Sequence, residues 1–232
     1  MKPQSLINLL ASATISIGLI TVLGAHPAAA IIIGGPGDPN SGNSIPFGST
    51  LSGPEYQQVY NSNNFSGPIL ITDITFYHHN FAGGSLNGGT YNLSLSTTTA
   101  AVNGLSSTFA NNLGANNTVV FSGGLPGFAA GEVDLFLSTP FLYDPGQGNL
   151  LLDVFGTNVT AGGVFLDARS GTAGTIFSRM VDDIATGTSS YGLVTGLNAA
   201  VPAPLAGAGL PGLILAGGGL LGWWRRRKKI AC

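Results

Sequence analysis

The chain has 232 residues, of which 36 are glycine and only 8% carry a charge, whereas soluble domains usually have about 25% charged residues. All ten acidic residues lie between positions 31 and 200, while five of the eight basic residues form one run at 225–229. The acidic middle offers no basic face to neutralise phosphates, which excludes a nucleic-acid partner. The shortage of Glu, Lys and Arg argues against a cytosolic helical protein.

Residues 1–30 have the three-part pattern of a secretory signal peptide. Lys2 precedes a long apolar stretch, and the small residues Ala28 and Ala30 then form a cleavage site. A permanent N-terminal membrane anchor is the alternative, but no stop-transfer charges follow the apolar stretch. We therefore predict an exported protein whose mature chain begins near Ile31.

The next segment, residues 31–64, is rich in Gly, Pro, Asn and Ser. Clusters of these residues are typical of loops and turns. We expect a largely irregular N-terminal segment with one strand near residues 57–60.

The largest part of the chain, residues 65–198, has the pattern of one β-rich domain. Short runs of β-branched and aromatic residues alternate with Gly, Asn and Pro clusters, which is typical of antiparallel strands joined by turns. Apolar side chains fall at every second position in Tyr91, Leu93 and Leu95, which predicts one buried face. The predicted fold is all-β, an antiparallel, jelly-roll-like β-sandwich. Residues 96–113 fit either a long loop or a short helix. The predicted strands are 69–77, 90–97, 118–122, 132–138, 149–155, 164–168, 176–181 and 191–195.

Catalytic residues are hard to find in this domain. His78 and His79 are adjacent, and adjacent residues of a strand point to opposite faces, so the two cannot easily bind one zinc ion. No serine stands in the Gly-x-Ser-x-Gly pattern of a hydrolase nucleophile. We therefore predict no enzymatic activity and keep a secreted hydrolase as the second alternative function.

Four side chains are candidates for binding calcium. Asp144 and Asn149 stand at the two ends of a glycine loop, and Asp182 and Asp183 form an adjacent pair. Calcium takes several oxygen ligands from carboxylates and carbonyls, but neither segment matches a known calcium loop. An Asp-Pro-Gly turn is also explained by backbone geometry alone. We predict no cofactor, with calcium as the one candidate.

Carbohydrate binding is the first alternative function. Exposed tyrosines could stack on a saccharide, although alternating aromatic residues more often belong to a core, and no tryptophan lies between residues 31 and 200. The candidates are Tyr56, Tyr60, Tyr77, Tyr143 and Tyr191.

The last part of the chain, residues 199–232, is typical of a membrane-directed tail. Its segment 205–224 has no charge, and a helix of that length would span about 30 Å, the hydrocarbon thickness of a bilayer. A basic run follows at once, and by the positive-inside rule it stays cytoplasmic while the middle of the chain faces outward. A simple single-pass anchor is the alternative to a sorting device. The basic residues are Arg225, Arg226, Arg227, Lys228 and Lys229. The one cysteine, Cys232, lies in this tail, so no disulfide is predicted.

The tail also resembles a known family. Val201-Pro202-Ala203-Pro204, a Gly-rich apolar helix and a basic run follow each other as in the C-terminal sorting tail called PEP-CTERM. The resemblance implies recognition in the inner membrane by an exosortase, a membrane-embedded cysteine protease, and delivery to the surface or exopolysaccharide matrix of Gram-negative bacteria. Ala203 stands where that family usually has Glu. The middle of the chain loosely resembles the β-sandwich ectodomains of the same family.

Together these features predict an exported protein that passes through the inner membrane and reaches the cell surface or extracellular matrix. Its domain is expected to be structural or adhesive. The expected partners are an exosortase and, outside the cell, polysaccharide.

Overall fold

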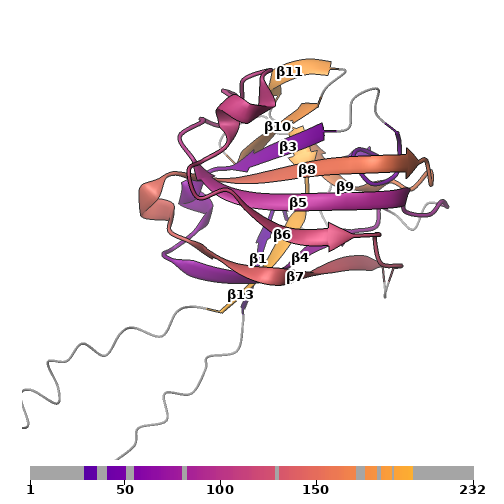
Figure 1. Cartoon of the computed structure of the whole chain (residues 1–232), viewed down its shortest axis with the longest axis horizontal. Helices are drawn as coiled ribbons and strands as arrows, with labels where there is room; N and C mark the ends of the chain where they lie inside the picture. Colours follow the sequence, from indigo (N-terminus) through magenta and orange to yellow (C-terminus); the bar gives the residue numbers. More distant parts are fainter. Residues whose placement is uncertain are drawn as a thin grey trace, which may run out of the picture.

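The computed structural model describes residues 29–35, 41–50, 55–79, 83–128, 131–170, 176–181, 184–189 and 191–200. Nearly all regular structure in these ranges is β-strand, and every strand pairing is antiparallel (Figure 1). The prediction of an antiparallel all-β fold is therefore confirmed. The strands are β1 (Ala29–Ile33), β2 (Ser41–Asn43), β3 (Glu55–Tyr60), β4 (Ile69–Tyr77), β5 (Gly88–Thr98), β6 (Thr118–Gly123), β7 (Glu132–Tyr143), β8 (Asn149–Thr160), β9 (Leu166–Ser170), β10 (Phe177–Val181), β11 (Ile184–Ser189), β12 (Tyr191–Leu193) and β13 (Thr195–Ala200). Three short 3-10 helices complete the described elements: η1 (Ser62–Asn64), η2 (Phe109–Asn112) and η3 (Pro145–Gln147).

The strands form three sheets. One has four strands in the order β1-β13-β4-β7, one has six in the order β11-β10-β3-β8-β5-β6, and one has three in the order β12-β9-β2. Neighbouring strands are often distant in sequence, as in the pairing of β3 with β8 and of β1 with β13. The fold therefore depends on contacts between segments from both ends of the domain.

One hydrophobic core joins the three sheets. Its buried side chains include Tyr91 on the six-stranded sheet, Leu135 on the four-stranded sheet and Leu166 on the three-stranded sheet. A buried contact between Tyr60 Oη and Thr195 Oγ1, 2.9 Å apart, also links the two larger sheets. The predicted alternation in β5 is confirmed, because Tyr91, Leu93 and Leu95 are all buried.

A second, smaller cluster lies on the other face of the six-stranded sheet. There Val59, Leu151 and Met180 pack against Leu105, which comes from the segment between β5 and β6. This segment, residues 99–117, contains the single short helix η2 and is otherwise irregular. Of the two structures predicted for residues 96–113, a long loop or a short helix, the structure shows a loop with one helical turn. We call residues 99–117 the covering loop.

The segment 31–64 contributes more structure than predicted. It holds most of β1, all of β2 and all of β3, where one strand was expected. β3 lies between β10 and β8 inside the six-stranded sheet (Figure 1). The reason is that hydrogen bonding to partners far along the chain fixes these residues as strands despite their turn-rich surroundings. Residues 31–64 are therefore part of the β fold rather than an irregular leader to it.

The two ends of the described fold are adjacent. β1 pairs with β13 in a continuous register from Ala29 opposite Ala199 to Ile33 opposite Thr195. All the described strands and both hydrophobic clusters lie within residues 29–200. Within the described residues, none of the helices is long and apolar enough to cross a membrane. The signal sequence up to residue 28 and the tail from residue 201 lie outside the described residues.

Candidate functional site

The predicted sorting and cleavage residues are only partly described. Ala30 lies in β1, opposite Asn198 of β13. Ala28, the four residues Val201, Pro202, Ala203 and Pro204, and the basic run 225–229 lie outside the described residues. The structure therefore places the predicted cleavage position at the start of a strand.

The calcium candidates Asp144 and Asn149 have structural roles in the turn that joins β7 to β8. Asp144 Oδ1 accepts a hydrogen bond from the Gly146 backbone N–H (2.9 Å), which caps η3. Asn149 Oδ1 accepts from the Ser62 backbone N–H (2.9 Å), and its Nδ2 donates to the Ala100 carbonyl (2.9 Å). Asp182 and Asp183 lie outside the described residues. Within the described ranges, no three His, Cys, Asp or Glu side chains form a group that could hold a metal ion.

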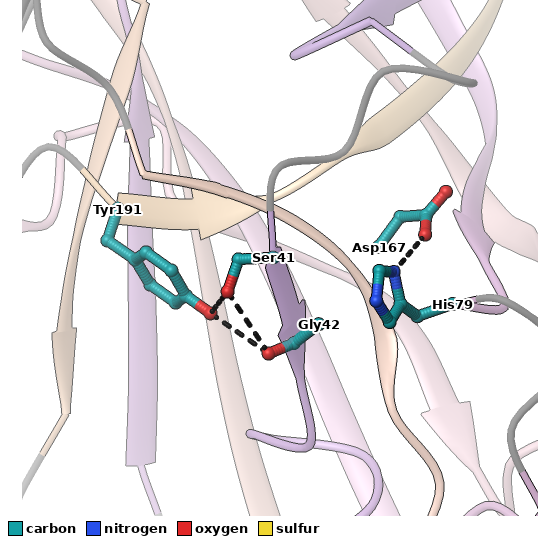
Figure 2. A network of polar contacts seen from close by, with 5 residues as sticks. All are labelled: Ser41, Gly42, His79, Asp167 and Tyr191. Carbon is teal, nitrogen blue, oxygen red and sulfur yellow. Dashed lines mark hydrogen bonds and ion pairs between the residues drawn. The ribbon is translucent and has the colours of Figure 1, made fainter.

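The two adjacent histidines contact different parts of the fold. His79 Nδ1 lies 2.9 Å from Asp167 Oδ1, in a half-buried pair that Figure 2 shows beside β2. The ring of His78 packs edge-on against Phe128, with 4.8 Å between the ring centroids. The His79 ring also lies over Gly42, where an added Cβ would be 2.6 Å from its Cδ2 atom. Position 42 therefore requires glycine as long as the ring stays in place.

A second polar contact lies on the other side of the same strand. Tyr191 Oη is 3.1 Å from Ser41 Oγ and donates to the Gly42 carbonyl (3.2 Å), as Figure 2 shows. Because successive side chains of a strand point to opposite faces, and His79 occupies the Cβ side of Gly42, Ser41 points away from His79. Ser41, His79 and Asp167 therefore do not form a nucleophile–base–acid arrangement. The Arg179 guanidinium lies 4.2 Å from the Tyr191 ring centroid and supports that ring through a cation–π contact.

Three of the five tyrosines considered for sugar binding are core residues. Tyr56, Tyr60 and Tyr143 are all fully buried, and burial raises the pKa of each phenol well above its usual range. They have no face available for a saccharide, so the hypothesis is wrong for these three. Tyr77 and Tyr191 are half-buried. Burial, followed by the nearby Glu132 and Asp134 carboxylates, raises the pKa of Tyr77.

A cluster of polar side chains is buried between the six-stranded sheet and the covering loop. Gln57 Nε2 donates to Asp153 Oδ1 (3.1 Å) and to the Phe109 carbonyl (3.2 Å). Asn112 Nδ2 in turn donates to Gln57 Oε1 (2.8 Å), so the loop is tied to the sheet by side-chain amides. Burial raises the pKa of the Asp153 carboxyl, while hydrogen bonds with Gln57 and Glu55 oppose that shift.

A small open cavity lies where β1 ends beside the six- and three-stranded sheets. Its volume is about 230 Å³, below the range typical of sites for drug-sized ligands. Arg169 lines it and donates from Nη1 to the Gly34 carbonyl (3.1 Å). Asn64 lines it too and donates from Nδ2 to the Ile176 carbonyl (2.8 Å). Its lining residues are Ile32, Ile33, Gly34, Gly35, Asn64, Arg169 and Ile176.

No local sequence pattern predicts this cavity. Its lining comes from four separate stretches of the chain, and only the fold brings them together. One signal was available: Arg169 is one of two basic residues between positions 31 and 200. Composition therefore singles out Arg169 but does not place it beside Gly34, whose carbonyl accepts its hydrogen bond in the fold.

Comparison with known proteins does not assign this chain to a family. No protein-family model matches the chain, and a search of curated proteins gives no significant match. The described residues form an antiparallel all-β domain with a small open cavity beside Arg169.

Proposed function

We propose that this chain is an exported, exosortase-sorted protein of the cell surface or exopolysaccharide matrix. In this proposal the β domain is a jelly-roll-like sandwich with a non-catalytic, structural or adhesive role. A cleaved signal peptide (1–30) precedes it and a sorting tail (199–232) follows it, with a transmembrane helix over 205–224.

The observation that carries this proposal is the pairing of the first strand with the last. Because Ala29 stands opposite Ala199, both predicted membrane-directed segments leave the domain from the same end of one sheet. A domain held by either segment would therefore present the same end to the membrane. Cleavage after Ala30 would still leave Ile31–Ile33 paired with β13, so removal of the signal peptide is compatible with the fold.

The sorting tail predicts where the mature chain ends. Mass spectrometry of surface material should find a C-terminus near residues 201–204, and no peptide containing Arg225. Replacing both Pro202 and Pro204 by alanine should keep the protein in the inner-membrane fraction, because the backbone is then free to continue as a helix. A surface-exposed protein with an intact basic run would contradict the sorting proposal. Replacing Pro126, a loop proline far from the tail in sequence, is the matched control and should leave sorting unchanged.

Carbohydrate binding is the second candidate function, and the cavity beside Arg169 favours it. A guanidinium binds carboxylates and hydroxyls with several hydrogen bonds, and the cavity is the size of a small ligand group rather than of a whole oligosaccharide. We expect residues 29–200 to bind an acidic glycan on an array at millimolar concentration or below. Arg169→Gln should weaken that binding at least about tenfold, the usual worth of a charge-assisted hydrogen bond. Circular dichroism should show that the variant keeps the β content of the unchanged domain. An array on which no glycan binds would remove this candidate.

A further inference from the structure

The outer face of the six-stranded sheet is only partly covered by the covering loop. The loop packs on Leu151 and binds Gln57 through the Asn112 side chain. Alternate residues of β8 share a face, so Phe155 stands on the same outer face as Leu151, further along the strand. Phe155 is 40% exposed. Part of this face therefore stays open beside the loop, and an aromatic ring lies in the open part.

Phe155 belongs to a row of side chains that crosses four neighbouring strands, β3, β8, β5 and β6 (Figure 1). Glu55 of β3 and Asn92 of β5 stand directly opposite Phe155, and Ser122 of β6 stands opposite Asn92. Directly paired residues of antiparallel strands share one face. With neighbouring strands spaced as in other sheets, the row is about 14 Å long. We call Glu55, Phe155, Asn92 and Ser122 the open row.

The polar members of the open row can reach a ligand from both sides of the ring. Asn92 and Ser122 are exposed, and Glu55 is half-buried. An amide both donates and accepts hydrogen bonds, a hydroxyl does the same, and a carboxylate accepts with two oxygens. The open row thus combines one apolar ring with donors and acceptors on the strands beside it.

A carboxyl pair next to the ring is costly for the fold. Glu55 hydrogen-bonds with Asp153, and burial raises the pKa of the Asp153 carboxyl. Two acidic side chains in contact repel each other when both are ionised, and burial adds to this cost. Titratable groups perturbed by burial and a close partner are frequent at functional sites. This pair therefore fits a role in binding better than a role in folding.

The charges near the open row favour an uncharged ligand. Arg169 and Arg179 are the only Lys or Arg residues between positions 31 and 200. Their guanidinium groups contact the Gly34 carbonyl and the Tyr191 ring, which belong to other parts of the fold. An anionic ligand on the open row would meet the Glu55 carboxylate without a cation to offset it.

We propose that the open row binds a neutral saccharide, with the C–H face of a sugar ring stacked on Phe155 and sugar hydroxyls hydrogen-bonded by Asn92 and Glu55. A sugar ring has an apolar face and a rim of hydroxyls, and the open row offers an aromatic face between polar side chains. Its length suits a short stretch of a polysaccharide chain rather than one sugar unit.

This site is separate from the cavity beside Arg169. None of the residues that line that cavity belongs to the open row, and the two sites favour glycans of different charge. The proposal also does not depend on the sorting tail. It can therefore fail while the sorting proposal and the acidic-glycan candidate both stand.

Titration calorimetry of the full chain with neutral oligosaccharides of glucose, galactose and mannose tests the proposal, in a detergent without a sugar head group. At least one of them should bind at millimolar concentration or below. Phe155→Ala should raise the dissociation constant about tenfold through loss of the stacked ring, whereas Phe155→Tyr keeps a ring and should retain binding. Asn92→Ala should weaken binding by roughly threefold to tenfold, the usual worth of one hydrogen bond.

Phe136→Ala is the matched control. Phe136 is even more exposed, at 74%, but it lies on β7 of the other large sheet. The residue paired with it, Asp73, is buried and accepts a hydrogen bond from Thr72. This change should leave the affinity unchanged, and circular dichroism should show the same β content for all four variants.

Three results would overturn the proposal. One is a chain that binds none of the neutral oligosaccharides at millimolar concentration, including the case in which Phe155→Ala abolishes self-association instead, which would assign the ring to a protein interface. Another is unchanged affinity in both Phe155→Ala and Asn92→Ala. The third is binding that Phe136→Ala abolishes and Phe155→Ala does not, which would place the saccharide on the four-stranded sheet.

Discussion

Replacing Gly114 by alanine is expected to lower the free energy of unfolding of the β domain by about 3 kcal/mol or more, at the upper end of the usual range for single substitutions. An added Cβ at this position would lie 1.8 Å from the Thr97 carbonyl oxygen and 2.7 Å from its carbon. Both atoms are backbone of β5, so neither can rotate away. The covering loop must therefore shift where it returns to the sheet.

The effect should extend beyond the clash itself. Gly114 donates its backbone N–H to Ser96 Oγ (3.2 Å), and the loop segment before it carries Asn112, which binds Gln57. If this segment lifts, Leu151 and Met180 lose the cover that buries them on the outer face of the six-stranded sheet. Loss of apolar burial and of buried hydrogen bonds would then add to the local strain.

Urea unfolding of residues 29–200 measures this prediction. Gly67→Ala is the control, because an added Cβ there would meet no atom within 4 Å. It should change the free energy of unfolding by no more than about 0.5 kcal/mol, as surface substitutions usually do. Equal effects of the two substitutions would show that the contact between Gly114 and Thr97 does not hold the loop.

Much of the fold class could be predicted from residue patterns. The two-residue period of Tyr91, Leu93 and Leu95 requires a strand with one buried face, and the structure buries all three. The period was less informative in β8, where Leu150, Leu151 and Leu152 are consecutive and all buried. A strand covered on both faces has no alternation, and only the covering loop explains why the second face is apolar.

The candidate sites were harder to predict than the strands. From the sequence alone, the polar hydroxyls of Tyr56 and Tyr60 were compatible with exposed side chains, yet both residues are buried. For Tyr60 the reason is a partner 135 positions away, because its hydroxyl lies 2.9 Å from Thr195 Oγ1. Likewise Arg169 and Asn64 meet in one cavity although more than a hundred residues separate them. Pairing between distant strands determines such contacts, and local propensity carries no information about them.

Replacing Asp153 by asparagine is expected to raise the free energy of unfolding of the β domain at neutral pH. Burial raises the pKa of the Asp153 carboxyl in the folded domain, despite hydrogen bonds with Gln57 and Glu55. In the unfolded chain the same carboxyl titrates near its ordinary value of about 4. Between these two pKa values the folded state binds more protons than the unfolded state, so the contribution of Asp153 to stability falls as the pH rises.

Asparagine carries no charge, so it should remove the free-energy cost of burying the ionised Asp153 carboxylate. It should also keep the hydrogen bonds of the polar cluster. Its Oδ1 can accept the hydrogen bond that Gln57 Nε2 donates to Asp153, and its amide can donate to the neighbouring Glu55. The advantage of Asp153→Asn over the unchanged domain should therefore be smallest near pH 4, grow as the pH rises, and become constant above the folded pKa.

Urea unfolding at several values between about pH 4 and pH 8, the range over which a buried carboxyl can titrate, tests this expectation. Asp144→Asn is the matched control, because it removes the same charge from the turn between β7 and β8, where asparagine can also cap η3. A stability difference at Asp153 that stays flat across this range would show that the buried carboxyl is not the source. A loss of stability at every pH would mean instead that the cluster needs the carboxylate, and that the Gln57 and Glu55 hydrogen bonds outweigh the cost of burying it.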